Sequence, residues 1–98
     1  MNDQERDDQQ FFPLGMVSGT PGVLKALENS EDDIGELLGR HLHLDQGALD
    51  QDDHAANHLA LIDGSRIFSA YELKNGQKIW IITEADRAHT TLLLPDEY

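Results

Sequence analysis

The feature that most constrains the fold of this chain is an Asn75-Gly76 pair between two segments rich in apolar residues, 66–74 and 77–84. Asn-Gly favours a two-residue type I′ turn, whose twist matches that of paired antiparallel strands. The apolar residues on both sides of the pair follow the period of two that is typical of strands. The sequence therefore predicts a β-hairpin, and the rest of the fold has to be built around it.

A two-residue turn also determines which residues lie on each face of the hairpin. It pairs Lys74 with Gln77 and places Tyr71 directly across from Trp80. One face then carries Phe68, Ala70, Ile79, Ile81 and Thr83, and the other carries Ile67, Tyr71, Leu73, Trp80 and Ile82. Packed helices can cover only one of these faces. Either residues 11–17 fold over the second face, or that face contacts another molecule.

Three helices are expected before the hairpin and one strand after it. The helices span about 21–29, 31–42 and 51–63, with N-caps at Thr20, Ser30 and Asp50 and a stop at Gly64. The stripes expected to be buried are Ile34, Leu37, Leu38 and Leu42 in the second helix and Ala55, Ala56, Leu59 and Ile62 in the third. The last strand spans 90–94 and ends at Pro95. We therefore expect an α+β fold in which three N-terminal helices pack on a C-terminal three-stranded antiparallel β-meander.

The length of 98 residues allows one domain. Residues 1–10 are polar and charged, which predicts a disordered acidic tail, and residues 11–98 are expected to form the single α+β domain. The chain has no cysteine and no apolar stretch as long as a membrane span. Its first ten residues lack the basic segment followed by an apolar segment that is typical of a signal peptide. We expect a cytoplasmic protein that does not interact with membranes.

The charge of the chain is strongly negative and unevenly distributed. There are 19 acidic and 7 basic residues, which gives a net charge of -12. Ten of the acidic residues and one basic residue fall within 28–63, whereas 64–98 carries five acidic and four basic residues. A field of this sign repels nucleic acid phosphates and attracts basic proteins. Direct binding of nucleic acid is therefore not expected, although charge of this kind also serves solubility alone.

Two groups of residues are candidates for chemistry. His54 and His58 are four residues apart on one helix face, a spacing that can hold a divalent metal, but the pattern lacks further ligands of a zinc enzyme. Glu84, Arg87 and His89 lie between the second and third predicted strands, where they suit a small ribonuclease or toxin-like enzyme. The alternative for this trio is a polar turn held by Arg87. No phosphate-binding loop or nucleotide motif is present, and we expect no cofactor.

Several segments resemble a family of small uncharacterised bacterial proteins that are called plasmid-related. The segments are GTPGVLKALE, RHLHLDQGALDQDDHAANHLAL and the C-terminal GSRIFSAYELKNGQKIWIITEADRAHTTLLLPDEY, so the resemblance covers about 19–98. Family members carry Gly-Asp-Trp-Gly where this chain has Leu44-Asp45-Gln46-Gly47, so the tryptophan is absent here. The resemblance implies a setting on plasmids, integrative elements or prophages, and it supplies no activity, cofactor or catalytic residue.

Charge and setting together favour a non-enzymatic binding protein. Acidic proteins of mobile elements include anti-restriction and anti-CRISPR inhibitors that present carboxylates in place of DNA phosphates. The expected partner is a basic, nucleic-acid-binding defence or regulatory protein of the host. The expected binding residues are Glu31, Asp32, Asp33, Glu36, Asp45, Asp50, Asp52 and Asp53. The alternatives are the enzyme described above and a regulatory homodimer that uses Tyr71, Trp80 and Ile82.

Overall fold

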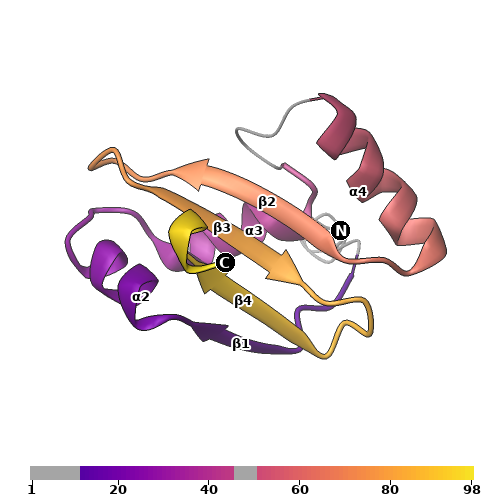
Figure 1. Cartoon of the computed structure of the whole chain (residues 1–98), viewed down its shortest axis with the longest axis horizontal. Coiled ribbons are helices and arrows are strands. Elements are labelled where there is room, and N and C mark those ends of the chain that lie inside the picture. Colours follow the sequence, from indigo (N-terminus) through magenta and orange to yellow (C-terminus); the bar gives the residue numbers. More distant parts are fainter. Residues whose placement is uncertain (1–11, 46–50) are drawn as a thin grey trace, which may run out of the picture.

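The computed structural model describes residues 12–45 and 51–98, except for the side chains of Gln51, Asp53 and His54 (Figure 1). The elements, in chain order, are β1 (Met16–Gly19), α2 (Pro21–Glu28), α3 (Ile34–Leu42), α4 (Gln51–Asp63), β2 (Ile67–Glu72), β3 (Lys78–Thr83), β4 (His89–Leu93) and the 3-10 turn η1 (Pro95–Glu97). The expected α+β class is confirmed. The tail expected at 1–10 and the cap expected at Asp50 lie outside the described residues.

The sheet has four strands in the order β1-β4-β3-β2 and is mixed, so the predicted three-stranded sheet is corrected. β2, β3 and β4 form the expected antiparallel meander, while β1 pairs in parallel with β4. Gly15 makes this addition possible: its φ is +67°, and a Cβ there would lie 2.3 Å from the carbonyl oxygen of Ala88. The next amide, that of Met16, donates to the same oxygen at 2.8 Å. Residues 16–19 therefore form an edge strand, and Phe12 packs in the core against His41, so this segment does not fold over the second face.

The hairpin between β2 and β3 has a three-residue loop, not the predicted two-residue turn. The Leu73 amide donates to the Gln77 carbonyl (2.7 Å), the Gly76 amide donates to the Leu73 carbonyl (2.9 Å), and Gly76 has a φ of +92°. This is a turn followed by a glycine bulge. The register moves by one residue, so that Tyr71 pairs with Ile79 and Trp80 with Ala70. The predicted pairing of Tyr71 with Trp80 is wrong, because a shift of one residue puts them on opposite faces.

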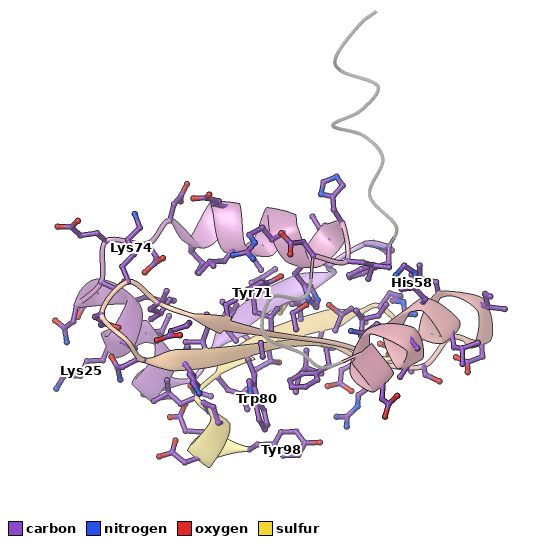
Figure 2. All side chains as sticks on the ribbon, turned by 90° about the horizontal axis from the view of Figure 1, so that it is seen from above. Lys25, His58, Tyr71, Lys74, Trp80 and Tyr98 are labelled. Carbon is purple, nitrogen blue, oxygen red and sulfur yellow. The ribbon has the colours of Figure 1, made fainter. Side chains whose placement is uncertain are left out.

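Helices α2 and α3 cover one face of the sheet, which we call the inner face (Figure 2). The main core cluster is Val23, Ala26, Leu37, Tyr71, Leu73, Ile79, Ile81 and Leu92. A second cluster joins the segment before β1 to the helices and comprises Phe12, Leu42, Leu44, Ala60 and Ile67. Tyr71 points to the side of α3, whereas Trp80 and Tyr98 lie on the opposite side, the outer face.

The first helix begins where the sequence predicts, and the second does not. The hydroxyl of Thr20 accepts the amide of Val23, with Pro21 at the first helical position. α3 is capped by Asp33 and not by Ser30, and it begins at Ile34. The correction has a local cause: the Ser30 hydroxyl accepts the Asp32 amide at 3.2 Å, which makes a turn of the residues expected to start the helix.

α4 lies beside the edge of β2, and its predicted inner stripe is wrong (Figure 1). Leu59 is 61% exposed and Ile62 is 84% exposed, and Ala55 and Ala56 are exposed as well. Among the side chains of α4 that the structure describes, Asn57 and Ala60 are the buried ones. Asn57 accepts the amide of Phe68 at 3.0 Å and donates to its carbonyl. The helix therefore satisfies the free backbone hydrogen-bonding groups at the edge of β2. This requires a polar residue on the side of α4 that faces the sheet, where apolar residues are usual.

Candidate binding surfaces

The acidic residues between α2 and α3 divide into anchors and exposed charges. Asp32 accepts the amide of Lys74 at 2.7 Å, which ties the connection to the hairpin loop, and this bond and the Ser30 hydroxyl hold the pKa of Asp32 below its usual range. Asp33 caps α3 through the amide of Gly35. Glu31 and Glu36 are exposed, and Glu36 acts on Arg40 through its charge, where it contributes least of the causes that raise the pKa of that guanidinium. Unlike Asp32 and Asp33, these two carboxylates neither cap a helix nor bind a backbone amide of the hairpin loop.

The remaining predicted acidic residues are more dispersed. Asp45 forms an ion pair with Arg40 at 2.9 Å and raises the pKa of that guanidinium, which also stacks over the ring of Tyr71 at 4.6 Å. Asp52 is exposed on α4. Asp50 and the side chain of Asp53 lie outside the described residues. The described members of the predicted set are thus spread over the α2–α3 connection, α3, the segment that follows α3, and α4.

Arg87 in the β3–β4 loop contacts the backbone of three segments. Its guanidinium donates to the carbonyl oxygens of Ser65, Ala60 (3.0 Å) and Glu84 (3.1 Å), and it lies over the ring of Phe12. Asp86 accepts the amide of Ala88 within the same loop. The geometry favours the structural reading of this loop, in which Arg87 binds backbone carbonyls and not the carboxylate of a neighbouring acid.

One histidine, His41, forms buried hydrogen bonds that the sequence does not predict. His41 is 0% exposed; its Nδ1 lies 2.6 Å from the Ser69 hydroxyl and its Nε2 lies 2.9 Å from that of Thr83. Thr83 continues to Thr90, whose hydroxyl donates to the carbonyl of Leu14. Burial lowers the pKa of His41 from 6.5 to about 4. A buried neutral imidazole thus joins α3 to three strands and to the segment before β1.

The alternative metal pair falls on α4. His58 is exposed, whereas the side chain of His54 lies outside the described residues. Within the described residues no group of three or more histidine, aspartate or glutamate side chains is placed to hold a metal ion.

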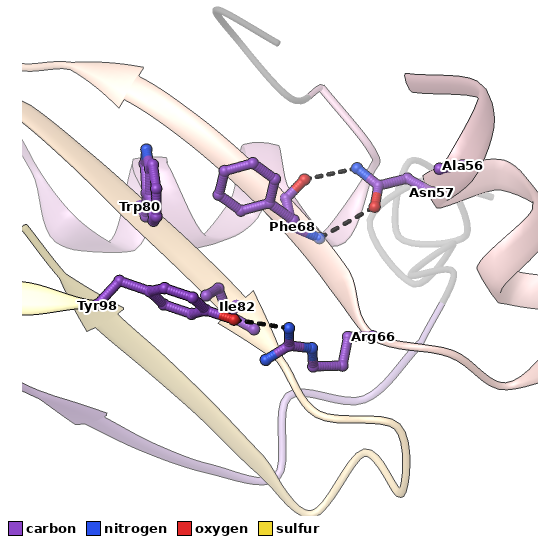
Figure 3. A pocket seen from close by; sticks show the side chains of 7 residues that line it. All are labelled: Ala56, Asn57, Arg66, Phe68, Trp80, Ile82 and Tyr98. Atoms are coloured by element: carbon purple, nitrogen blue, oxygen red, sulfur yellow. Dashed lines mark hydrogen bonds between the residues drawn. The ribbon is translucent and has the colours of Figure 1, made fainter. Parts of the chain in front are cut away.

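The outer face of the sheet carries an open cavity of about 360 Å³, which we call the aromatic pocket (Figure 3). Its lining residues are Ala56, Asn57, Arg66, Phe68, Trp80, Ile82 and Tyr98. The Trp80 ring meets Phe68 at 5.0 Å and Tyr98 at 5.6 Å between centroids, both edge to face. Of the residues predicted for a dimer face, Trp80 and Ile82 line this pocket, and Tyr71 lies on the other side of the sheet.

Arg66 is the one charged side chain among the residues that line the aromatic pocket. Its Nη2 donates to the hydroxyl of Tyr98 at 2.8 Å, and its guanidinium lies 5.9 Å from the centroid of the same ring. The bond to Tyr98 and, to a smaller extent, the carboxylate of Glu84 raise the pKa of Arg66. Sequence reasoning missed Arg66, Phe68 and Tyr98 because their meeting depends on the register of the hairpin and on the path of the chain after Pro95.

In the part of the chain that is described, no helix has both the length and the apolar character needed to cross a bilayer. Comparison with protein-family models, curated proteins and solved structures finds no match to this chain.

Proposed function

We propose that this chain is a non-enzymatic binding protein that docks through acidic side chains on a basic, nucleic-acid-handling protein and inhibits or regulates it. The observation that carries the proposal is the net charge of -12 together with the exposure of Glu31 and Glu36 near the start of α3. Exposed carboxylates of this kind can meet a cationic surface directly. The mobile-element setting implied by the sequence resemblance supports an inhibitor of host defence.

The enzymatic alternative receives less support from the geometry. Three of the five N–H donors of the Arg87 guanidinium are bound to backbone carbonyls, so only two are left for a phosphate. An RNA substrate would also approach a protein of strongly negative charge. A nuclease using Glu84, Arg87 and His89 predicts RNA cleavage that is lost in His89→Ala.

The test begins with capture of host proteins on the immobilised chain, followed by measurement of the dissociation constant of the captured partner at several salt concentrations. We expect steep weakening with salt and displacement of the partner by duplex DNA, because both compete for the same cationic groups. Affinity that does not change with salt would contradict the proposal.

A pair of charge reversals tests whether the surface is local. Glu31→Lys and Glu36→Lys alter the proposed surface, and Glu72→Lys makes the same change of charge at an exposed position of β2. We expect the first two variants to weaken binding about tenfold or more and Glu72→Lys to act only through long-range charge. Equal weakening by all three variants would show that net charge acts without a defined docking surface.

A further inference from the structure

The aromatic pocket has the size and lining of a site for a small ligand, independent of the acidic surface. Its volume of about 360 Å³ falls in the range of small-molecule sites. Phe68, Trp80 and Ile82 supply an apolar floor from two neighbouring strands, and Tyr98 forms one wall (Figure 3). The edge-to-face rings leave faces and edges against which a planar group can pack. A planar aromatic group therefore suits this lining.

The polar groups of the pocket are hydrogen-bond donors. The side-chain amide of Asn57 already donates to the carbonyl of Phe68 and accepts from its backbone amide. The phenol oxygen of Tyr98 accepts from Arg66, so the phenol hydrogen remains to be donated, and within the described part of the chain it has no acceptor. The guanidinium of Arg66 has five N–H donors, of which one is used by Tyr98.

These donors exclude one class of ligand and favour another. Aromatic clusters often hold cations, but here Arg66 already lies over the Tyr98 ring and would repel a second positive charge. A carboxylate instead matches the planar fork of a guanidinium, can accept two of its N–H groups, and can accept the Tyr98 hydroxyl as well. From this geometry we propose that the aromatic pocket binds an aromatic carboxylate, with its ring against Trp80 and Phe68 and its carboxylate on Arg66 and Tyr98.

The negative net charge of the protein repels an anionic ligand, but this repulsion weakens with distance. Charges beyond about 8 Å are largely screened at physiological salt, whereas Arg66 contacts the ligand directly. Glu84 is the carboxylate whose field reaches Arg66. It is not among the residues that line the pocket, so neutralising it changes the electrostatics without changing the shape of the site.

Trp80 is the single tryptophan of the chain and lies in the pocket, so its fluorescence reports occupancy. The probes are 3-phenylpropanoate, 3-phenylpropan-1-ol and 3-phenylpropan-1-amine, which share a ring and differ in charge. We expect saturable changes in Trp80 emission, with the carboxylate binding roughly tenfold more tightly than the alcohol and the amine binding most weakly. Absence of saturable binding, or an amine that binds as tightly as the carboxylate, would overturn the proposal.

Three variants locate the carboxylate. Arg66→Gln should weaken 3-phenylpropanoate roughly tenfold and leave the alcohol little changed, Tyr98→Phe should weaken it by a smaller factor, and Glu84→Gln should strengthen it about twofold. Arg66 and Glu84 are not in the core, so circular dichroism should show unchanged folding. If Arg66→Gln weakens the carboxylate and the alcohol by the same factor, the guanidinium does not recognise the anion and the proposal is wrong.

An aromatic carboxylate can be a free metabolite or the C-terminus of a peptide that ends in phenylalanine. N-acetyl-Gly-Phe with a free carboxylate and the same dipeptide as an amide distinguish the two. Binding of the acid form alone supports the proposal and identifies a peptide C-terminus as one source. If neither dipeptide binds while 3-phenylpropanoate does, the proposal holds for free small molecules. Neither result depends on the acidic surface, so this proposal and the proposed function fail separately.

Discussion

At the scale of single residues, His41 is the side chain on which most buried polar groups depend. The direction of its hydrogen bonds follows from one carbonyl: Thr90 donates to Leu14, so Thr83 has to donate to Thr90. Thr83 then accepts from His41 Nε2, and Nδ1 accepts from the hydroxyl of Ser69. A neutral imidazole satisfies this chain of bonds as it stands. Protonation would place a charge in a buried site and would require the Ser69 hydroxyl to turn from donor to acceptor.

Acid should therefore destabilise the protein before most carboxylates titrate. Burial lowers the pKa of His41 from 6.5 to about 4, so between these values the unfolded chain binds a proton that the folded chain does not. Stability should be full above pH 6.5 and should fall by about 3 kcal/mol as the pH drops to about 4. Urea unfolding at a series of pH values measures this loss.

His41→Gln provides the control for the pH profile. The glutamine amide offers an NH2 donor group and a carbonyl acceptor and does not titrate. The variant should lower stability at neutral pH, because the amide fits the imidazole site imperfectly, and should flatten the slope between pH 6.5 and 4. A variant that keeps the full slope would assign the acid sensitivity to other groups.

Arg87 is a second residue whose role can be measured by stability alone. Its guanidinium joins α4, the loop before β2 and the β3–β4 loop through three carbonyls. An ammonium cannot reach all three at once, so Arg87→Lys should lower the free energy of unfolding by about 2 kcal/mol. Arg66→Lys replaces an exposed arginine that has one hydrogen bond, and it should change stability by less than about 0.5 kcal/mol. An unchanged melting temperature in Arg87→Lys would indicate that Arg87 is free for another task.

At the scale of elements, the sequence predicts which segments form strands and helices better than it predicts their faces. The hairpin, β4 and α2 follow from turn residues, a proline and a capping threonine, which act locally. The register of the hairpin does not follow from such signals, because Asn75-Gly76 fits both a two-residue turn and a three-residue loop. The choice between them moves the side chains of one strand to the other face relative to its partner strand. β1 has no local signal either, since Met16–Gly19 becomes a strand only through pairing with β4.

The candidate sites show the same limit. The spacing of Trp80 and Ile82 places them on one face of the hairpin, as predicted, but Tyr71 was wrongly grouped with them, and the aromatic pocket also needs Arg66 and Tyr98, which lie at opposite ends of the C-terminal region. The acidic residues were visible from composition, while the internal roles of Asp32 and Asp33 required the contacts of a hairpin loop and a helix start. The sequence shows how many carboxylates there are, but only the structure shows which of them are bound inside the molecule and which are exposed.

The edge of β2 gives a prediction at the scale of a helix and a strand. Asn57 is the residue of α4 that satisfies both backbone groups of Phe68, and it is buried. Asn57→Ala leaves an amide and a carbonyl unpaired at this edge, so it should cost about 2 kcal/mol of unfolding free energy. Leu59→Ala, on the exposed side of the helix, should cost less than about 0.5 kcal/mol. A larger loss in Leu59→Ala than in Asn57→Ala would mean that α4 packs through the stripe predicted from its sequence.

At the scale of the whole molecule, the excess of negative charge acts on stability as well as on binding. With 19 acidic and 7 basic residues, repulsion among carboxylates opposes the compact state. The ion pair of Arg40 with Asp45 relieves only a small part of it, because Glu31, Glu36 and Glu72 remain exposed. A protein that carries this much unrelieved charge gains stability from any cationic surface that covers it.

Salt should therefore stabilise the free protein even though it weakens the proposed complex. Raising ionic strength from about 0.01 M to about 0.15 M shortens the screening length from about 30 Å to about 8 Å. Relief of about 1 kcal/mol corresponds to a rise of roughly 4–8 °C in melting temperature for a domain of this size. Glu31→Gln with Glu36→Gln should raise the melting temperature at low salt and reduce its dependence on salt, since two repelling charges are removed. Calorimetry over this salt range measures both effects, and a melting temperature that falls with salt would show that attractive pairs dominate, leaving no unrelieved charge with which to draw a basic partner.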